Sequence, residues 1–240
     1  MNPFSLWLAL GVTLGLWQVA HSGPPRARFA RLGLGLAVLM AALIGARLGY
    51  VILHPTYFRA HPLVIPQVWQ GGLSGVGALL GGLVGLGGLA WGLRRSWLVL
   101  GADLLPLLPT VTAAAWLGCW DAGCAYGPSA PAGAWWALPI RDEWGHTTLR
   151  WPLQPLAAMS LLALFWAMER RWQEPPAAHR VGWGGLVFAL HTVLFSLARA
   201  DEPPTWNAIR LDLALGTLLG AGCLILLLWN MFPIGRKTVS

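Results

Sequence analysis

Seven long apolar stretches, separated by short polar connections, constrain this chain more than any other feature. Each stretch is close to the roughly 20 apolar residues that a helix needs to cross a hydrocarbon core of about 30 Å. Only 10% of the residues are charged and 56% are hydrophobic, which excludes a soluble globular protein. The sequence therefore predicts an all-α integral membrane protein of about seven transmembrane helices, with residues 1–240 as a single polytopic domain. The stretches cover residues 4–20, 32–53, 73–93, 97–120, 152–168, 181–198 and 209–229.

The distribution of Lys and Arg over alternate connections predicts how the chain is oriented. Ten of the sixteen basic residues fall on one side, and Arg47 lies inside the second stretch. Because cytoplasmic loops carry the excess of Lys and Arg, we expect an outside N-terminus and a cytoplasmic C-terminus. The basic residues form no continuous face, so the net charge of +7 does not indicate nucleic acid. The ten are Arg26, Arg28, Arg31, Arg94, Arg95, Arg170, Arg171, Arg180, Arg236 and Lys237.

Glycines in the third stretch predict a close helix contact. Gly77, Gly81 and Gly85 recur at four-residue spacing. Small residues at this spacing let the backbones of two membrane helices approach closely. The alternative interpretation is a cavity opened by the missing side chains.

Four arginines are candidates for binding an anionic headgroup. Arg47 lies toward the outer end of an apolar helix, where it either snorkels to the interface or holds a lipid phosphate in a bidentate contact. Arg150, Arg199 and Arg210 lie at predicted outer helix ends. Each alone fits interface anchoring, and together with Arg47 they would line one anionic pocket.

The cysteines and one histidine leave several interpretations open. Cys119 and Cys124 fit either a disulfide or two free thiols. A catalytic thiol has less support, because no histidine is close in sequence to activate it. Two thiols do not form a four-ligand zinc site, so no metal is expected. His191, the one histidine well inside an apolar stretch, is either a hydrogen-bonded packing residue or a ligand to a haem or pigment.

Several short motifs together resemble the prolipoprotein diacylglyceryl transferase family. The strongest blocks are residues 45–51 and 68–74, and the resemblance extends over residues 46–218. Residues 118–127 are similar to a cysteine-bearing version of the family signature, and Arg150, Pro152 and Gln154 look like the Arg-His-Pro-x-Gln segment of the family. The resemblance implies a multi-pass protein of the bacterial cytoplasmic membrane. It also implies transfer of diacylglyceryl from phosphatidylglycerol to a lipoprotein cysteine.

The chain departs from the family at positions that the resemblance marks as catalytic. The family histidine falls on Val76 and the signature arginine on Trp116. A further family arginine falls near His191 or Thr192, and the acidic residue after it falls on Ser196. Each charge-stabilising group that is lost slows such a reaction by a factor of about a hundred or more. We therefore leave the catalytic residues unassigned.

Three functional hypotheses follow. The first is a catalytically impaired transferase-like protein that binds phospholipid, acts as a subunit of a membrane complex, or both. The second is active diacylglyceryl transfer, and the third is a pigment or redox subunit. The first two require no cofactor, and we expect none, with a phosphatidylglycerol-like lipid as ligand. The expected binding residues are Arg47, Tyr50, Arg150, Gln154, Arg199 and Arg210.

Overall fold

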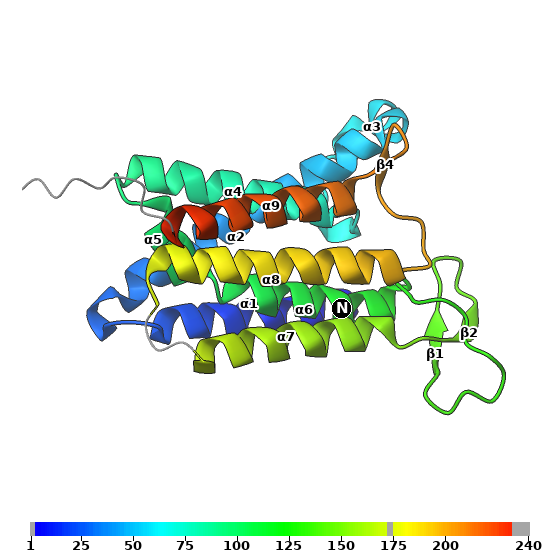
Figure 1. Cartoon of the computed structure of the whole chain (residues 1–240). Helices are drawn as coiled ribbons and strands as arrows, with labels where there is room; N and C mark the ends of the chain where they lie inside the picture. The colour runs from blue at the N-terminus through cyan, green and yellow to red at the C-terminus, as the bar shows by residue number, and fades with distance from the viewer. Residues whose placement is uncertain (1–2, 172–174, 232–240) are drawn as a thin grey trace, which may run out of the picture.

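The computed structural model describes residues 3–171 and 175–231, and it shows a bundle of roughly parallel and antiparallel helices (Figure 1). Two short antiparallel hairpins lie at one end of the bundle. The longer helices are α1 (Pro3–His21), α2 (Arg28–Leu53), α4 (Gly75–Gly92), α5 (Trp97–Leu104), α6 (Leu107–Ala122), α7 (Leu153–Arg171), α8 (Ala177–Ala198) and α9 (Leu211–Met231). The short elements are η1 (Pro25–Ala27), α3 (Pro55–Ala60), η2 (Pro62–Val64), η3 (Val68–Gln70), β1 (Leu138–Arg141), β2 (Thr147–Arg150), β3 (Thr205–Trp206) and β4 (Ile209–Arg210).

Every apolar stretch coincides with a helix or a pair of helices, which confirms a mostly helical membrane protein. The stretch at 97–120 is divided into α5 and α6, bent by 47°, where Pro106 lacks the N–H that would continue the helix. Among the described residues, five helices are long and apolar enough to cross a membrane, and the bent pair would be a sixth. The remaining predicted span, at residues 152–168, corresponds to α7, which is not one of these helices. It is a helix of 19 residues with polar residues such as Gln154 and Glu169 near its ends. The two hairpins are additions to the predicted all-α fold.

The bundle has two chemically different ends. One end, which we call the hairpin end, carries α3 and both hairpins (Figure 1). The other, which we call the arginine end, carries the turns that join α1 to α2 and α4 to α5, together with the last turn of α7 and the first turn of α8. Eight of the ten arginines and lysines assigned to the cytoplasmic side lie in these segments. Arg236 and Lys237 lie outside the described residues, and the orientation itself stays a prediction.

Glycines bring α2 and α4 into backbone contact. A Cβ built on Gly49 would lie 2.9 Å from the Cα of Gly77, and one built on Gly77 or Gly81 would collide with the backbone of α2 near Gly45. Gly85 faces the side chain of Ala41. The first interpretation of the glycine spacing, a close helix contact, is confirmed here.

Candidate functional site

Arg47 binds backbone carbonyls of the segment that connects α3 to α4. Its Nε donates to the carbonyl of Ile65 at 2.8 Å, and one terminal nitrogen donates to Val64 at 2.6 Å. The other terminal nitrogen donates to Gly71 at 2.7 Å and to Gly72 at 3.0 Å. The side chain is buried and thereby attaches residues 62–72 to α2. Its contact with a lipid phosphate stays a prediction.

The two glycines that Arg47 contacts have a backbone that few other residues adopt. Gly71 and Gly72 have φ values of +88° and +68°. A Cβ on Gly72 would also lie 2.8 Å from a terminal nitrogen of Arg47 and 2.6 Å from the ring of Tyr50. Tyr50 itself stacks on His54, with ring centroids 4.1 Å apart. These glycines are the sequence signal for the role of Arg47, which we did not predict.

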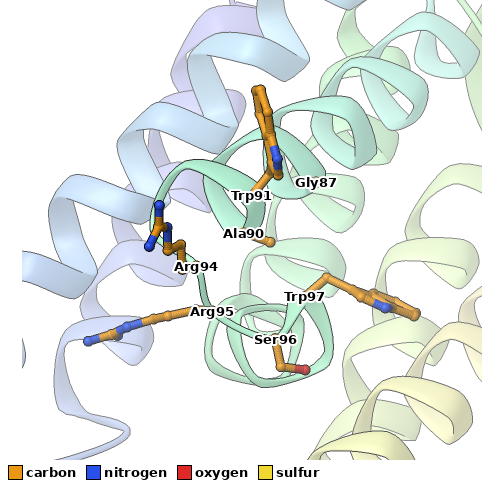
Figure 2. Close-up of a pocket in the computed structure, with 7 residues that line it drawn as sticks. All are labelled: Gly87, Ala90, Trp91, Arg94, Arg95, Ser96 and Trp97. Atoms are coloured by element: carbon orange, nitrogen blue, oxygen red, sulfur yellow. The ribbon is translucent and has the colours of Figure 1, made fainter.

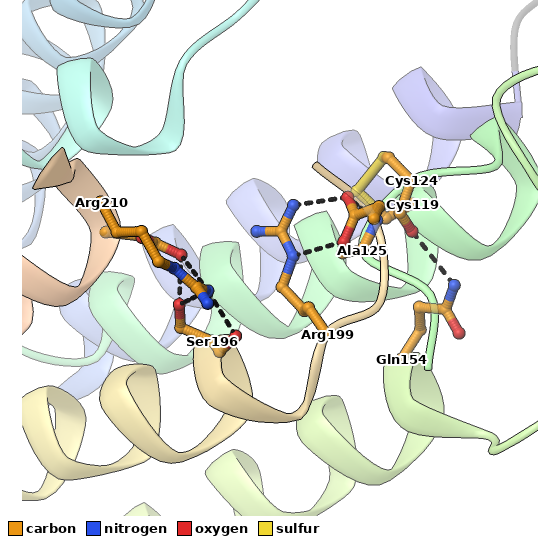
Figure 3. Close-up of polar contacts among 9 residues, drawn as sticks. Cys119, Cys124, Ala125, Gln154, Ser196, Arg199 and Arg210 are labelled. Carbon is orange, nitrogen blue, oxygen red and sulfur yellow. Dashed lines mark hydrogen bonds and ion pairs between the residues drawn. A yellow bond between two sulfur atoms is a disulfide. The ribbon is translucent and has the colours of Figure 1, made fainter. Parts of the chain in front are cut away.

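A disulfide joins Cys119 to Cys124 at the end of α6 (Figure 3). Gly123 takes the left-handed conformation that ends the helix, and the amide of Cys124 donates to the carbonyl of Cys119. The turn is held from two other segments. Nε2 of Gln154 donates to the carbonyl of Cys124 at 3.1 Å, and the amide of Ala125 donates to the carboxylate of Asp201 at 2.8 Å.

Arg199 is paired with a carboxylate. Its Nε and a terminal nitrogen donate to the two oxygens of Asp201 at 2.8 and 2.6 Å (Figure 3). Such a two-point pair has the favourable geometry of Arg with a carboxylate. Because Asp201 also accepts from Ala125, this pair fixes the segment after α8 against the disulfide turn.

Arg210, which is half-buried, contacts the buried Ser196 of α8 and Asp212 of α9. A terminal nitrogen donates to the carbonyl of Ser196 at 2.7 Å and to its hydroxyl at 2.8 Å, and lies 3.4 Å from Asp212. The Ser196 hydroxyl donates to the same carboxylate. The resemblance places an acidic residue at position 196, and in the structure Asp212 brings a carboxylate against that position from α9.

Arg150 lies over an aromatic ring beside the longer hairpin. Its guanidinium is 4.2 Å from the ring centroid of Tyr126, and a terminal nitrogen is 3.4 Å from Asp142. Burial raises the pKa of Tyr126 to about 12, and a hydrogen bond with Glu143 acts in the same direction. The phenol of Tyr126 therefore stays protonated at neutral pH.

Three predicted binding residues carry buried polar atoms that lack a partner. Nε of Arg150, Oε1 of Gln154 and Nε of Arg210 are buried without a hydrogen bond among the residues that the structure describes. The same holds at the arginine end for Nε of Arg28, Nε of Arg31 and Nδ1 of His179. Buried polar groups are nearly always hydrogen-bonded, so each such atom requires an explanation.

The positions that the resemblance marks as catalytic have apolar or local contacts. Trp116 packs edge-on against Phe195, with centroids 5.9 Å apart, and Phe195 stacks on His191 at 4.4 Å. The hydroxyl of Thr192 donates to the carbonyl of Phe188, one turn earlier in α8. Val76 is half-buried in the first turn of α4. None of the three offers a charge to a reaction.

His191 takes part in a hydrogen-bonded contact between α7 and α8. Its Nε2 lies 3.0 Å from the carbonyl of Ala157 and 3.1 Å from the hydroxyl of Ser160. Because a carbonyl only accepts, Nε2 carries the proton, and this nitrogen is not free to ligate a haem iron. Within residues 3–171 and 175–231, no group of three His, Cys, Asp or Glu could hold a metal ion.

Replacing Cys119 and Cys124 together by serine is expected to lower the free energy of unfolding by about 2 kcal/mol, the value for a short closed loop. Unfolding is measured in mixed micelles with and without reductant. Reductant should lower the free energy of unfolding of the wild type to that of the double variant, and it should not change the free energy of unfolding of the double variant. A wild type insensitive to reductant under unfolding conditions would contradict a stabilising bond.

Comparison with known proteins identifies the family. The sequence model of the family described as prolipoprotein diacylglyceryl transferase matches residues 1–231. A protein of Burkholderia multivorans is 29% identical over 168 residues, covering 69% of this chain and 56% of that protein. A protein of Paracidovorax citrulli is 33% identical over 158 residues, covering 61% of this chain and 57% of that protein. A protein of Burkholderia mallei is 36% identical over 171 residues, covering 69% of this chain and 56% of that protein.

All three relatives are named phosphatidylglycerol–prolipoprotein diacylglyceryl transferase. The chain spans little more than half the length of these curated relatives. The family model, by contrast, matches nearly the whole chain, and the chain therefore belongs to the prolipoprotein diacylglyceryl transferase family.

Proposed function

We propose that this chain has a prolipoprotein diacylglyceryl transferase-type function, with a phosphatidylglycerol-like phospholipid bound at the hairpin end. The observation that carries the proposal is the gathering of Gln154, Arg199 and Arg210 (Figure 3) and of Arg150 at this end, where three of these side chains keep a polar atom without a partner among the described residues. A phosphate accepts hydrogen bonds from the two guanidinium N–H groups, and a glycerol hydroxyl donates one to the amide oxygen. The names of the relatives support this class of ligand.

The charges of this end suit a polar headgroup better than a free anion. Arg150, Arg199 and Arg210 are accompanied by Asp142, Asp201 and Asp212. Each guanidinium is therefore largely neutralised, and each carboxylate is an acceptor for a headgroup hydroxyl. The excess of Lys and Arg at the opposite end supports the inference that this end faces outward from the bacterial cytoplasmic membrane.

We further propose that the transfer step is slow in this protein. Transfer forms a bond between the sulfur of a lipoprotein cysteine and the diacylglyceryl carbon, while the bond from that carbon to the phosphate oxygen breaks. The thiol proton needs a base, and the departing phosphate needs cations. Val76, Trp116 and Thr192 provide neither at the positions where the family resemblance expects them. Phospholipid binding, alone or within a membrane complex, would then be the main activity.

Transfer at the ordinary rate of the family is the second candidate. The family match and the names of the relatives favour it directly. The carboxylates of Asp201 and Asp212 would be its candidate bases.

Growth of a transferase-depleted bacterial strain distinguishes the two candidates in the cell. We expect a correctly inserted, well-expressed copy of this chain to leave growth unrestored, whereas an authentic family enzyme restores it. Full restoration would reject slow transfer and favour the second candidate.

A further inference from the structure

A second candidate site lies at the arginine end, far along the bundle from the hairpins. A shallow cavity of about 520 Å³, open over most of its surface, lies beside the turn that joins α4 to α5 (Figure 2). None of the lining residues is acidic. They are Gly87, Ala90, Trp91, Arg94, Arg95, Ser96 and Trp97.

The two arginines of this cavity have no partner in the described part of the chain. Neither guanidinium is within hydrogen-bond or ion-pair distance of another described group. Arg26, Arg28 and Arg171 at the same end likewise have no such partner among the described residues, whereas two others do. Arg31 donates to the hydroxyl of Ser22 and the carbonyl of Pro24, and Arg180 pairs with Glu169. Figure 2 shows Arg94 and Arg95 extending to the same side of the turn.

Two exposed tryptophans indicate the level in the membrane at which the cavity lies. Trp91 is 87% exposed at the end of α4, and Trp97 is 50% exposed at the start of α5. Exposed tryptophans at helix ends lie at the level of the lipid headgroups. We therefore expect the guanidinium groups of Arg94 and Arg95 to lie near the level of the lipid phosphates.

Arg94 occupies a backbone position that normally belongs to glycine. Its φ is +52°, in the left-handed region. The amide of Arg95 donates to the carbonyl of Ala90, and that of Arg94 to Trp91, so α4 ends in the turn where glycine is preferred. Ala125, Asn207 and Ala208 share this left-handed backbone, and at each such position a glycine would avoid the strain.

We propose that this cavity binds the phosphate of an anionic phospholipid from the leaflet at the arginine end. The guanidinium groups of Arg94 and Arg95 supply positive charge, and the tryptophans lie at the level of the headgroups. No carboxylate in the lining competes with the phosphate for the arginines. The site is separate from the hairpin end and does not depend on the transfer reaction. It gives the protein one lipid site in each leaflet.

The test counts lipids that the whole protein retains after extraction from vesicles of phosphatidylglycerol and phosphatidylcholine, by native mass measurement. The double variant Arg94→Gln, Arg95→Gln is expected to lose one bound phosphatidylglycerol. The control, Arg170→Gln with Arg171→Gln, removes the same charge from the same end and should retain it.

A single substitution separates binding from folding. Arg94→Gly relieves the left-handed backbone, so its melting temperature should rise while the retained phosphatidylglycerol is lost. Equal retention by the Arg94/Arg95 double variant and its control would overturn the proposal and leave the pair as general interface anchors. Retention of phosphatidylcholine in place of phosphatidylglycerol would also overturn it.

Discussion

Replacing Arg47 by leucine is expected to lower the free energy of unfolding by about 3 to 5 kcal/mol, because several buried carbonyls would be left without a donor at a cost of roughly 1 to 3 kcal/mol each, partly regained by water. The carbonyls of Val64, Ile65, Gly71 and Gly72 would lose their buried donor. Each hydrogen bond to a charged group contributes roughly 1.5 to 3 kcal/mol before the loss is partly regained by water. Denaturant titration in mixed micelles gives the measurement.

Two further variants make the result specific to the guanidinium. Arg59→Leu removes an exposed arginine from α3 and should change the stability by less than about 0.5 kcal/mol. Arg47→Lys keeps the charge but not the planar guanidinium, so the stability of this variant should lie between those of the wild type and Arg47→Leu. Equal stability of the Arg47→Leu and Arg59→Leu variants would mean that the segment 62–72 does not depend on Arg47.

Replacing Gly77 by leucine is expected to cost about 3 kcal/mol or more, at the upper end of the range for an overpacked core. A side chain at this position would collide with the backbone of α2 at Gly45 and Gly49, which cannot move aside as a flexible side chain does. Thermal unfolding in detergent measures the loss. Gly77→Ala provides a smaller step if the leucine variant does not accumulate.

Gly88→Leu is the matched control for the glycine contact. Gly88 lies on the same helix, but a Cβ built there would meet nothing within 4 Å. Its melting temperature should therefore stay close to that of the wild type. If both leucine variants melted alike, the close approach of α2 and α4 would not contribute to stability.

The helices and the glycine contact were predictable because both depend on local patterns. Apolar length marks a helix in a membrane, and four-residue glycine spacing places small residues on one helix face. The bend before α6 was missed, although Pro106 was its signal. The longer hairpin was missed because β1 and β2 have only four residues each, within a loop rich in Pro and Gly.

The candidate site was predictable only in part. The sequence singled out Arg150, Arg199 and Arg210 by their places at helix ends, but not Asp142 and Asp212, which lie beside Arg150 and Arg210. The Arg150 partner, Asp142, is eight residues away across a hairpin turn, and Asp212 meets Ser196 only because α8 and α9 pack together. Tertiary contacts of this kind leave no periodic signal in one sequence.

Arg47 illustrates the same limit. Its neighbours in sequence are apolar, which favoured a lipid partner, whereas the groups that it binds are carbonyls up to 25 residues away. A search for buried backbone acceptors would need the path of residues 62–72, which hydropathy does not provide.

The most direct measurement is transfer of labelled diacylglycerol from phosphatidylglycerol to a lipobox peptide by the purified protein, beside an authentic family enzyme. We expect phosphatidylglycerol to be retained while label moves at least about 100-fold more slowly than with that enzyme, the effect of losing one charge-stabilising group. Transfer at a comparable rate would contradict slow catalysis and make Asp201 and Asp212 the first residues to replace in a search for the catalytic groups.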